Sequence, residues 1–319
     1  MHILILGAAG MLGRKLTAAI SAGALPFTRL TLADVVMAKA QPGATSIALD
    51  LTDPGAPATL LQHRPDLIFH LAAIVSGEAE ADFAKGYAIN LDATRALLDA
   101  IAAIPGYCPK LVFASSLAVF GAPFPPVIPD DFHLTPRSSY GTQKAMTELL
   151  ISDYSRRGFF DGVAIRLPTI CIRPGAPNRA ASGFYSSILR EPLNGLPANL
   201  PVRDSLRHWF ASPRAATSFF LRAASLDTSA LGPSRALTMP GLSASVAEMI
   251  EALRRVAGQA AVDLITRIPD PAIAAIVEPW AEAFAASRAR ALGFAAETSF
   301  DDIIRIYLAD DQPHHSAHR

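Results

Sequence analysis

A tyrosine and a lysine four residues apart are the side chains in this sequence best suited to move a proton. They open and close Tyr140-Gly-Thr-Gln-Lys144, at the start of a segment with a helical pattern. Residues with this spacing lie on one face of a helix, one turn from each other. A phenol with an ordinary pKa of about 10 is a poor base at neutral pH, and an adjacent ammonium group lowers that pKa. The pair is therefore predicted to be an acid/base unit, although the same spacing is common by chance in surface pairs.

A glycine-rich turn near the N-terminus is typical of a loop that binds a dinucleotide. Gly7, Gly10 and Gly13 stand where a short apolar run gives way to a helical pattern. Glycines at such a junction let a pyrophosphate approach the free N–H groups of the helix N-terminus. Their spacing differs from the strict Gly-x-Gly-x-x-Gly pattern, and a tight turn with close helix packing would use the same residues.

An aspartate at the end of the next apolar run indicates which dinucleotide is expected. Asp34 stands 21 residues after Gly13, close to the roughly 20 expected for the residue that binds the adenosine ribose. Its carboxylate would accept hydrogen bonds from both ribose hydroxyls and repel a 2′-phosphate, which predicts NAD over NADP. Asp50 and Leu51 follow a third run and could reach the adenine. For Asp50, capping of the next helix is an equally good interpretation.

These residues must be positioned by a sheet, and the first half of the chain predicts one. The expected strands are short runs that are apolar on both faces: His2–Leu6, Leu30–Ala33, Ser46–Leu49, Leu67–Leu71, Lys110–Ala114 and Gly162–Leu167. Helical patterns alternate with them. The fold class is therefore α/β, a Rossmann-type doubly wound parallel sheet with right-handed crossovers.

Two local features of the helices are also predicted. Asp53 is the expected N-cap of a helix with Pro54 at its first position. The helix that carries Tyr140 is expected to bury the residues of one stripe: Ala145, Leu149, Leu150 and Tyr154.

After Leu167 the regular alternation ends. Residues 168–205 are rich in Pro, Gly, Asn and Arg, which predicts loops that line a pocket. Helices are expected at about Pro213–Ala224, from the Ser245 capping box to before Gly258, near Ala272–Phe294 and at Asp301–Leu308. We therefore expect an NAD-binding domain of residues 1–168 plus about 206–230. A smaller mixed C-terminal substrate domain would comprise about 169–205 and 231–310, and residues 311–319 would form a frayed tail.

The composition excludes several classes of protein. The 319 residues include 28 basic and 28 acidic side chains, and zero net charge disfavours nucleic-acid or anionic-membrane partners. With 51% hydrophobic and 18% charged residues, the chain must bury a large apolar interior, and global disorder is excluded. Cys108 and Cys171 are too few for a disulfide framework and lack metal-ligand spacing, so both are expected to be reduced and buried, with no metal site. The start has no basic leader and no run is long enough to cross a membrane, so we expect a cytoplasmic protein.

Together these motifs resemble the extended short-chain dehydrogenases/reductases, over essentially the whole chain. The resemblance rests on the glycine loop, His70-Leu71-Ala72-Ala73, Asn90, Ser115-Ser116, Tyr140-x-x-x-Lys144 and Leu292-Gly293-Phe294. It implies that Tyr140 is the catalytic acid/base and that Lys144 holds the nicotinamide ribose. A serine would position the reacting oxygen. In the family this serine lies four residues before the aromatic of an aromatic-glycine pair, and counting back from Phe120-Gly121 selects Ser116.

The resemblance also implies which residues contact the cofactor, NAD. The expected set is Gly7, Gly10, Met11, Leu12, Gly13, Asp34, Asp50, Leu51, Leu71, Ala72, Asn90, Tyr140, Lys144 and Thr169. His70 and Asn90 are expected to serve structure and backbone placement, and neither is expected to be catalytic. Cys171 is expected to be inert, whereas Trp209 could wall the substrate pocket or pack in the core.

Four stretches narrow the reaction that the resemblance implies. Residues 153–161, 166–175, 207–214 and 237–241 resemble sugar-acid dehydrogenases of the family, which implies oxidation of the 2-hydroxyl of D-erythronate, a four-carbon sugar acid. Ser116 and Tyr140 would contact the reacting oxygen, and Arg173 or Arg207 would bind the carboxylate. Arg179 and Arg214 stay open as alternatives, although Arg214 is better explained as a solvated surface charge.

Other reactions of the family require residues that this chain has only in part. Dehydratases carry an Asp-Glu pair directly after the functional Ser or Thr, where this chain has Leu117-Ala118, so dehydration is not expected. The alternative is a sugar-nucleotide epimerase that retains its NAD, since Arg207-His208-Trp209 keeps the arginine of a nucleotide-binding segment but lacks its acid. A non-catalytic NAD sensor is disfavoured, because it needs no proton-transfer group. The resemblance further implies a homodimer through the helices that carry Leu97 and Leu149.

Overall fold

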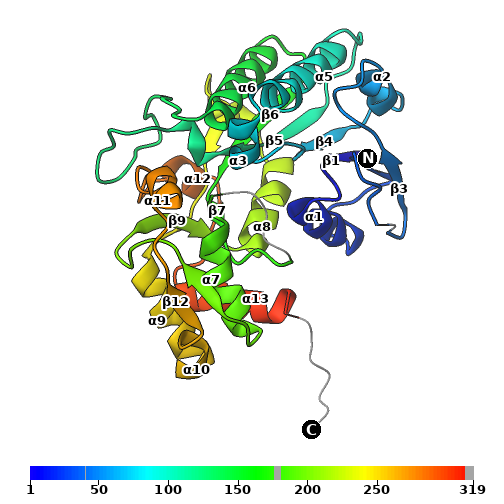
Figure 1. Ribbon diagram of the computed structural model, residues 1–319. Coiled ribbons are helices and arrows are strands. Elements are labelled where there is room, and N and C mark those ends of the chain that lie inside the picture. Colours follow the sequence, from blue (N-terminus) through cyan, green and yellow to red (C-terminus); the bar gives the residue numbers. More distant parts are fainter. Residues whose placement is uncertain (40, 176–180, 313–319) are drawn as a thin grey trace.

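The computed structural model describes residues 1–39, 41–175 and 181–312. Its central element is a seven-stranded sheet in the order β10-β6-β5-β4-β1-β2-β3, and all neighbouring strands are parallel (Figure 1). The strands are β1 (His2–Leu6), β2 (Arg29–Asp34), β3 (Ala44–Ala48), β4 (Leu67–His70), β5 (Lys110–Ser116), β6 (Asp161–Leu167) and β10 (Ala236–Thr238). The chain order reverses between β1 and β4, where doubly wound sheets bind ligands. The predicted doubly wound parallel sheet is confirmed.

Helices cover both faces of this sheet because alternate strand residues point to opposite sides. Ile3 and Ile5 of β1 pack in a cluster with α1 (Met11–Ser21) and α8 (Pro213–Ala224). Leu4 and Leu6 pack in a second cluster with α2 (Ala56–Leu61), α5 (Ala93–Ala102) and α6 (Ser139–Arg156). In Figure 1, α5 and α6 lie on one side of the sheet and α1 and α8 on the other. The connection from β4 to α5 contains α3 (Ser76–Ala81), α4 (Phe83–Tyr87) and a π-helical turn, Ala88–Asp92.

A smaller, mixed α/β part has its own hydrophobic core. Its sheets are β11-β9-β7, in which β9 and β11 are antiparallel, and the parallel pair β12-β8. The strands are β7 (Thr169–Ile170), β8 (Ala198–Leu200), β9 (Arg207–Ala211), β11 (Leu242–Ser245) and β12 (Ile265–Arg267). Its helices are α7 (Gly183–Leu193), α9 (Val246–Ala257), α10 (Gln259–Val262), α11 (Pro271–Val277) and α13 (Phe300–Asp310), whereas α12 (Ser287–Ala291) packs Ala289 into the core of the large sheet. The predicted α8, the capping box of α9 and α13 are confirmed.

Several boundaries differ from the sequence-based expectations. Residues 168–205 are not only loops, since they contain β7, α7 and β8; the glycine that opens α7 and Pro192 in its last turn hide its helical pattern. β10 pairs with β6 in the large sheet, and β9 belongs to the small one, in each case opposite to our division of the chain. Both strands are too short to show a period in the sequence.

Three further local predictions are wrong. The helix expected near Ala272–Phe294 is two short helices, α11 and α12, separated by residues 278–286. Helix α2 has Gly55 and not Asp53 as its N-cap. Cys108 is exposed, while Cys171 is buried as expected.

Among the described residues no helix is long and apolar enough to cross a membrane.

Asp311 and Gln312, which were expected in a frayed tail, have side-chain partners in the structure. The Asp311 carboxylate forms an ion pair of 2.6 Å with the Lys15 ammonium group of α1. The Gln312 side chain donates a hydrogen bond of 2.8 Å to the Leu193 carbonyl oxygen. The remaining tail, 313–319, lies outside the described residues.

The buried face of α6 is mainly polar, which the apolar pattern did not predict. The buried residues are Gly141, Gln143, Lys144, Ala145, Thr147, Glu148, Ile151 and Ser155. Leu149, expected in the core, is 64% exposed. The helix turns its polar face inward because side chains such as Lys144 and Glu148 find hydrogen-bond partners on the sheet.

Helix α1 packs against the end of β1 at a distance that only glycine permits. A Cβ atom at Gly13 would lie 2.2 Å from the Gly7 carbonyl oxygen and 2.7 Å from Cα of Ala8. We expect Gly13→Ala to lower the free energy of unfolding by about 1–3 kcal/mol, the range for overpacking, as measured by thermal and denaturant unfolding. Gly55→Ala is the matched control, because a Cβ there meets nothing within 4 Å. Equal stability of the two variants would contradict this packing.

Candidate active site

The carboxyl ends of β1, β4, β5 and β6 bring most of the predicted site residues to one edge of the sheet. Gly7 follows β1, and a Cβ atom on it would lie 2.7 Å from the Ala72 backbone nitrogen. Leu71 and Ala72, which follow β4, therefore lie directly against the glycine loop. Ser116 ends β5 and pairs in register with Leu167, the last residue of β6.

The glycine loop leaves the N-terminus of α1 open to an anion. Gly7 has a φ of 82°, a conformation that favours glycine, and the chain turns there into α1. The N-cap, Gly10, offers no side-chain hydrogen bond, and the first turn, which begins with Met11 and Leu12, carries no acidic residue. The first N–H groups of a helix need partners from outside the helix. The loop therefore fits the pyrophosphate of a dinucleotide.

Asp34 is held beside this loop by the backbone. Its carboxylate accepts a hydrogen bond of 2.9 Å from the Ala9 N–H. The Val36 N–H approaches the other carboxylate oxygen at 3.4 Å. The half-buried carboxylate keeps lone pairs for further donors, and its place at the end of β2 suits a ribose.

Asp50 caps a turn and does not cap a helix, so one of its two sequence interpretations is wrong. Its carboxylate accepts hydrogen bonds from the Thr52 N–H (2.8 Å) and hydroxyl (2.7 Å), which lower the pKa of Asp50. Helix α2 begins only at Ala56. Leu51 is half-buried and packs against the hydrophobic cluster that lies between the sheet and helices α2, α5 and α6.

Asn90 and His70 are buried behind the site, with protein partners. The Asn90 side chain bonds both the N–H and the carbonyl of Ile74 and donates to the Gln143 amide oxygen (2.8 Å). The His70 Nε2 atom lies 3.1 Å from the Thr94 hydroxyl. Burial, aided by Lys144, lowers the pKa of His70 to about 3, so its ring is neutral. Asn90 thus fixes the loop after β4 and ties it to α6.

Lys144 is buried one helical turn from Tyr140. Ser138 caps α6 by accepting a hydrogen bond of 3.1 Å from the Gly141 N–H, which sets where the helix begins. The Lys144 Nζ atom donates to the Ala114 carbonyl oxygen at 2.8 Å and lies 5.6 Å from the centre of the Tyr140 ring. Burial lowers the pKa of Lys144 to about 7, while the negative charge of Glu148 opposes this shift.

The environment of the Tyr140 phenol contains a cation that the sequence did not assign to it. Burial raises the pKa of Tyr140, and a hydrogen bond with Ser116 and the positive charge of Arg173 oppose the increase. Desolvation acts most strongly, so the phenol is protonated at neutral pH in the protein alone. No spacing in the sequence relates Arg173, which follows β7, to Tyr140 of α6, so only the fold brings this charge into the environment of the phenol.

The two serines at the end of β5 have different partners. The Ser115 hydroxyl is buried and donates to the Glu148 carboxylate at 2.5 Å. Ser116 bonds Tyr140, and its oxygen accepts a hydrogen bond of 3.2 Å from the Ala118 N–H. Ser116 is therefore the serine that faces the phenol.

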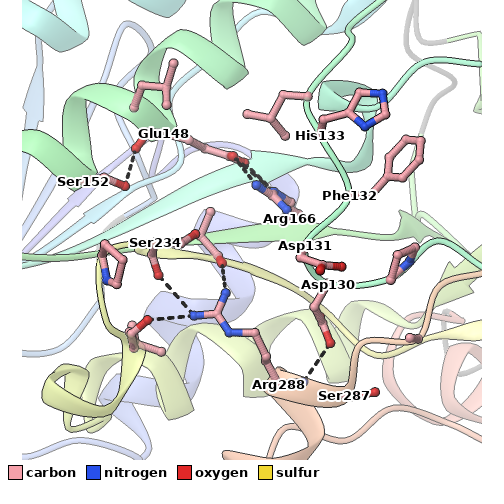
Figure 2. A pocket seen from close by; sticks show the side chains of 17 residues that line it. Asp130, Asp131, Phe132, His133, Glu148, Ser152, Arg166, Ser234, Ser287 and Arg288 are labelled. Atoms are coloured by element: carbon pink, nitrogen blue, oxygen red, sulfur yellow. Dashed lines mark hydrogen bonds and ion pairs between the residues drawn. The ribbon is translucent and has the colours of Figure 1, made fainter.

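Sequence reasoning missed the buried ion pair beneath these residues. The Arg166 guanidinium group of β6 contacts both oxygens of Glu148, with its shortest distance 2.7 Å. Figure 2 shows this pair among the side chains that line a pocket of about 820 Å³, to which α6 also contributes Leu149 and Ser152. Ser116, Tyr140 and Lys144 do not line that pocket. Two features of the sequence could have indicated the pair. Glu148 stands four residues after Lys144, on the same helix face, and Arg166 is a charged residue within an apolar strand.

The arginines considered for a substrate carboxylate lie in different places. Arg173 is half-buried, and its side chain donates to the Ile170 carbonyl oxygen (3.0 Å) and the Ser182 hydroxyl (2.8 Å). Arg207 forms an ion pair of 2.7 Å with Glu248 at the start of α9. Arg214 forms a surface ion pair with Asp310. Arg179 lies outside the described residues.

The remaining candidates divide between the site edge and the core. The Thr169 hydroxyl oxygen, in β7, lies 2.7 Å from the Nε2 atom of His208. Burial raises the pKa of the Cys171 thiol to about 12, which makes it a poor nucleophile. Trp209 is 5% exposed, donates to the Met239 carbonyl oxygen and packs against Phe284, so it is a core residue.

Known proteins resemble this chain over nearly its whole length. A D-erythronate dehydrogenase from Cupriavidus necator is 47% identical over 97% of this chain and 98% of its own length. One from Haemophilus influenzae is 41% identical over 98% of this chain and 100% of its own. A solved structure described as a nucleoside-diphosphate-sugar epimerase from Agrobacterium tumefaciens is 58% identical with a TM-score of 0.94, covering 97% of this chain and 94% of that one.

More distant structures share the fold alone. The holo form of a GalE-like L-threonine dehydrogenase from Cupriavidus necator has a TM-score of 0.86 at 22% identity, covering 97% of this chain and 99% of that one.

The model of the NAD dependent epimerase/dehydratase family matches residues 3–210, which include the glycine loop, Ser116, Tyr140 and Lys144. The chain belongs to this family, and its cofactor is NAD.

Proposed function

We propose that this NAD-dependent dehydrogenase oxidises the 2-hydroxyl of D-erythronate to the 2-keto acid. The proposal is carried by the phenol of Tyr140, which meets Ser116 at the sheet edge with the charge of Arg173 beside it. This arrangement suits an alcohol that also bears an anionic group. The two relatives named D-erythronate dehydrogenases, similar over nearly the full chain, support the choice of substrate.

Each residue of the proposed site has a distinct task. Ser116 donates a hydrogen bond to the reacting oxygen, and Tyr140 accepts the proton of the 2-hydroxyl as a phenolate. Bound NAD supplies the acceptor for the hydride from C2 and a positive ring that favours the phenolate. Lys144, anchored to Ala114, donates to the nicotinamide ribose. The oxidation thus yields the keto acid, NADH and one proton.

The proposed cofactor site consists of the loop residues and the strand ends around them. Gly7, Gly10, Met11, Leu12 and Gly13 bind the pyrophosphate, and Asp34 binds the adenosine ribose. Asp50, Leu51, Leu71, Ala72 and Thr169 line the dinucleotide further along the edge. Asn90 contributes by holding the loop at Ile74 and not by direct contact.

We propose that Arg173 binds the substrate carboxylate. It is half-buried, its charge acts on Tyr140, and a guanidinium group suits a carboxylate. Arg207 is the weaker candidate because it is engaged by Glu248. The exposed Leu149 and Met146 of α6 are compatible with the homodimer that we propose through α5 and α6.

The alternative function is epimerisation of a sugar nucleotide, which the 58% identical structure described as an epimerase favours. It is weakened by His208, which replaces the acid of the nucleotide-binding segment, and by the ion pair of Arg207. Incubation with free NAD and D-erythronate distinguishes the two: steady formation of NADH supports the dehydrogenase. No NADH with D-erythronate, together with isomerisation of a UDP-hexose, would establish the epimerase.

Removal of the phenol oxygen tests the proton acceptor. We expect Tyr140→Phe to lower kcat by at least roughly 100-fold, because general acid/base catalysis is lost. NAD binding, followed by fluorescence titration, should be largely retained. Turnover equal to that of the wild type would exclude Tyr140 as the base.

Removal of the Asp34 charge tests the choice of cofactor. Asp34→Asn keeps an acceptor for the Ala9 N–H but no longer repels a 2′-phosphate, so the preference for NAD over NADP should fall. The readout is the ratio of kcat/KM with the two cofactors. Asp34→Ala should weaken the preference similarly and also loosen the loop. A wild type that already prefers NADP would contradict this role.

Removal of a guanidinium group tests the carboxylate contact. We expect Arg173→Met to raise KM for D-erythronate roughly 10- to 100-fold, the loss typical of a charge-assisted hydrogen bond. Arg214→Met, at the surface pair with Asp310, is the matched control and should leave KM unchanged. If Arg207→Met raised KM and Arg173→Met did not, the contact would belong to Arg207.

A further inference from the structure

Thr169 lies just beyond the end of β6, next to the proposed site. It lies two residues beyond Leu167, which pairs with Ser116. The next residue, Ile170, accepts a hydrogen bond of 3.0 Å from Arg173, whose charge acts on Tyr140. Pro168 and Ile170 are buried, whereas Thr169 is half-buried. Of these three consecutive residues, Thr169 is the one that is not fully buried.

His208, the partner of Thr169, has a tautomer that its surroundings fix. Its Nδ1 atom lies 3.0 Å from the carbonyl oxygen of Ala281, and a carbonyl can only accept. Nδ1 therefore carries the proton. Burial lowers the pKa of His208 to about 4, so at neutral pH the Nε2 atom has no proton and can only accept.

The ring of His208 is also held in its plane. The Tyr185 ring of α7 stacks on it at an interplanar angle of 12°, and the Trp280 ring lies 5.1 Å away, centre to centre. With 5% exposure, the imidazole has no room to turn its Nδ1 edge towards Thr169. The contact of 2.7 Å between Nε2 and the Thr169 oxygen is therefore a hydrogen bond donated by the threonine hydroxyl.

We propose that Thr169 is a hydrogen-bond acceptor for the bound ligand and that His208 is the positioning residue that fixes this polarity. A hydroxyl group has one proton and two lone pairs, and here the proton is directed to His208. Only lone pairs then face the site. The ligand atom opposite Thr169 must be an N–H or O–H donor, and a carboxylate or keto oxygen is disfavoured there.

Two parts of the bound complex offer such a donor. One is the carboxamide N–H₂ group of the nicotinamide, and the other is a hydroxyl group of the sugar acid. The second source rests on the proposed function, whereas the first requires only NAD. In either case Thr169 selects the orientation of the ligand, since the reversed arrangement would set two acceptors against each other.

A structural role for Thr169, confined to satisfying the buried His208, makes a different prediction. Such a role changes the thermal stability of the variants and leaves ligand binding unaltered. An acceptor role changes the Kd for NAD or the KM for D-erythronate. The ligand constants of variants that stay folded therefore separate the two roles.

The test compares four single variants. Thr169→Val removes the acceptor at similar size and should raise either the Kd for NAD or the KM for D-erythronate about tenfold. Thr169→Ser keeps the hydroxyl and should stay near the wild type. His208→Leu frees the threonine proton and should raise the same constant, whereas His208→Gln offers an acceptor in place of Nε2 and should rescue it. Thr169→Val combined with His208→Leu should be no worse than Thr169→Val alone, because both act through one hydrogen bond.

Altered ligands then identify the donor. With the 3-acetylpyridine analogue of NAD, which lacks the amide N–H₂, the penalty of Thr169→Val should vanish if the carboxamide is the donor. With a 3-deoxy or 4-deoxy sugar acid it should vanish if that hydroxyl is the donor. Either result supports the proposal.

Unchanged ligand constants in a folded Thr169→Val protein would overturn the proposal, as would full additivity of the Thr169 and His208 effects. A wild type that forms no NADH from D-erythronate would instead contradict the proposed function. The Kd for NAD would still test Thr169 in that case, so the two failures are distinguishable.

Discussion

The site depends on one constraint, the polar contact between α6 and the carboxyl ends of β5 and β6. Lys144 donates to Ala114, and the Glu148 carboxylate joins Ser115 to Arg166. Removing one partner of a buried ion pair costs about 3–5 kcal/mol, although the intact pair adds little net stability. Its consequence is geometric, since it fixes the register of α6 on the sheet and so places Tyr140 against Ser116.

The same burial sets the charge state of the site before a cofactor binds. Desolvation raises the pKa of the Tyr140 phenol and lowers that of the Lys144 ammonium group. Both residues are thereby biased towards their neutral forms. The charge of Arg173 and the Ser116 hydrogen bond favour the phenolate, but desolvation outweighs them. In the mechanism that we propose, the positive ring of bound NAD lowers the pKa of the Tyr140 phenol. The phenolate therefore forms in the complex with NAD and not in the free protein.

The sequence predicts the parts of the fold that rest on periodicity and on local motifs. The first six strands of the large sheet, the glycine loop, helix α8 and the capping box of α9 are readable because each depends on neighbouring residues. Helix α7 and strand β10 were missed, since one carries Gly183 and Pro192 and the other is three residues long. The polar inner face of α6 was missed because charged residues are expected outside unless a partner is known. The partners of Glu148 are Ser115 of β5 and Arg166 of β6, and only the fold brings these strands against α6.

The candidate site divides in the same way. Tyr140 and Lys144 share a helix, so their proximity follows from spacing, and the family motif identifies Ser116. The effect of the Arg173 charge on Tyr140 and the hydrogen bond between Thr169 and His208 both cross between separate elements. No pattern along the chain indicates such contacts.

Titration of Tyr140 tests whether burial raises the pKa of this phenol and bound NAD lowers it again. The ultraviolet absorbance of tyrosinate, taken as the difference between the wild type and Tyr140→Phe, gives the titration of this phenol alone. We expect a pKa above the ordinary value of about 10 in the free protein and a clearly lower one with saturating NAD. An ordinary pKa in the free protein, or the same curve with and without NAD, would contradict this expectation.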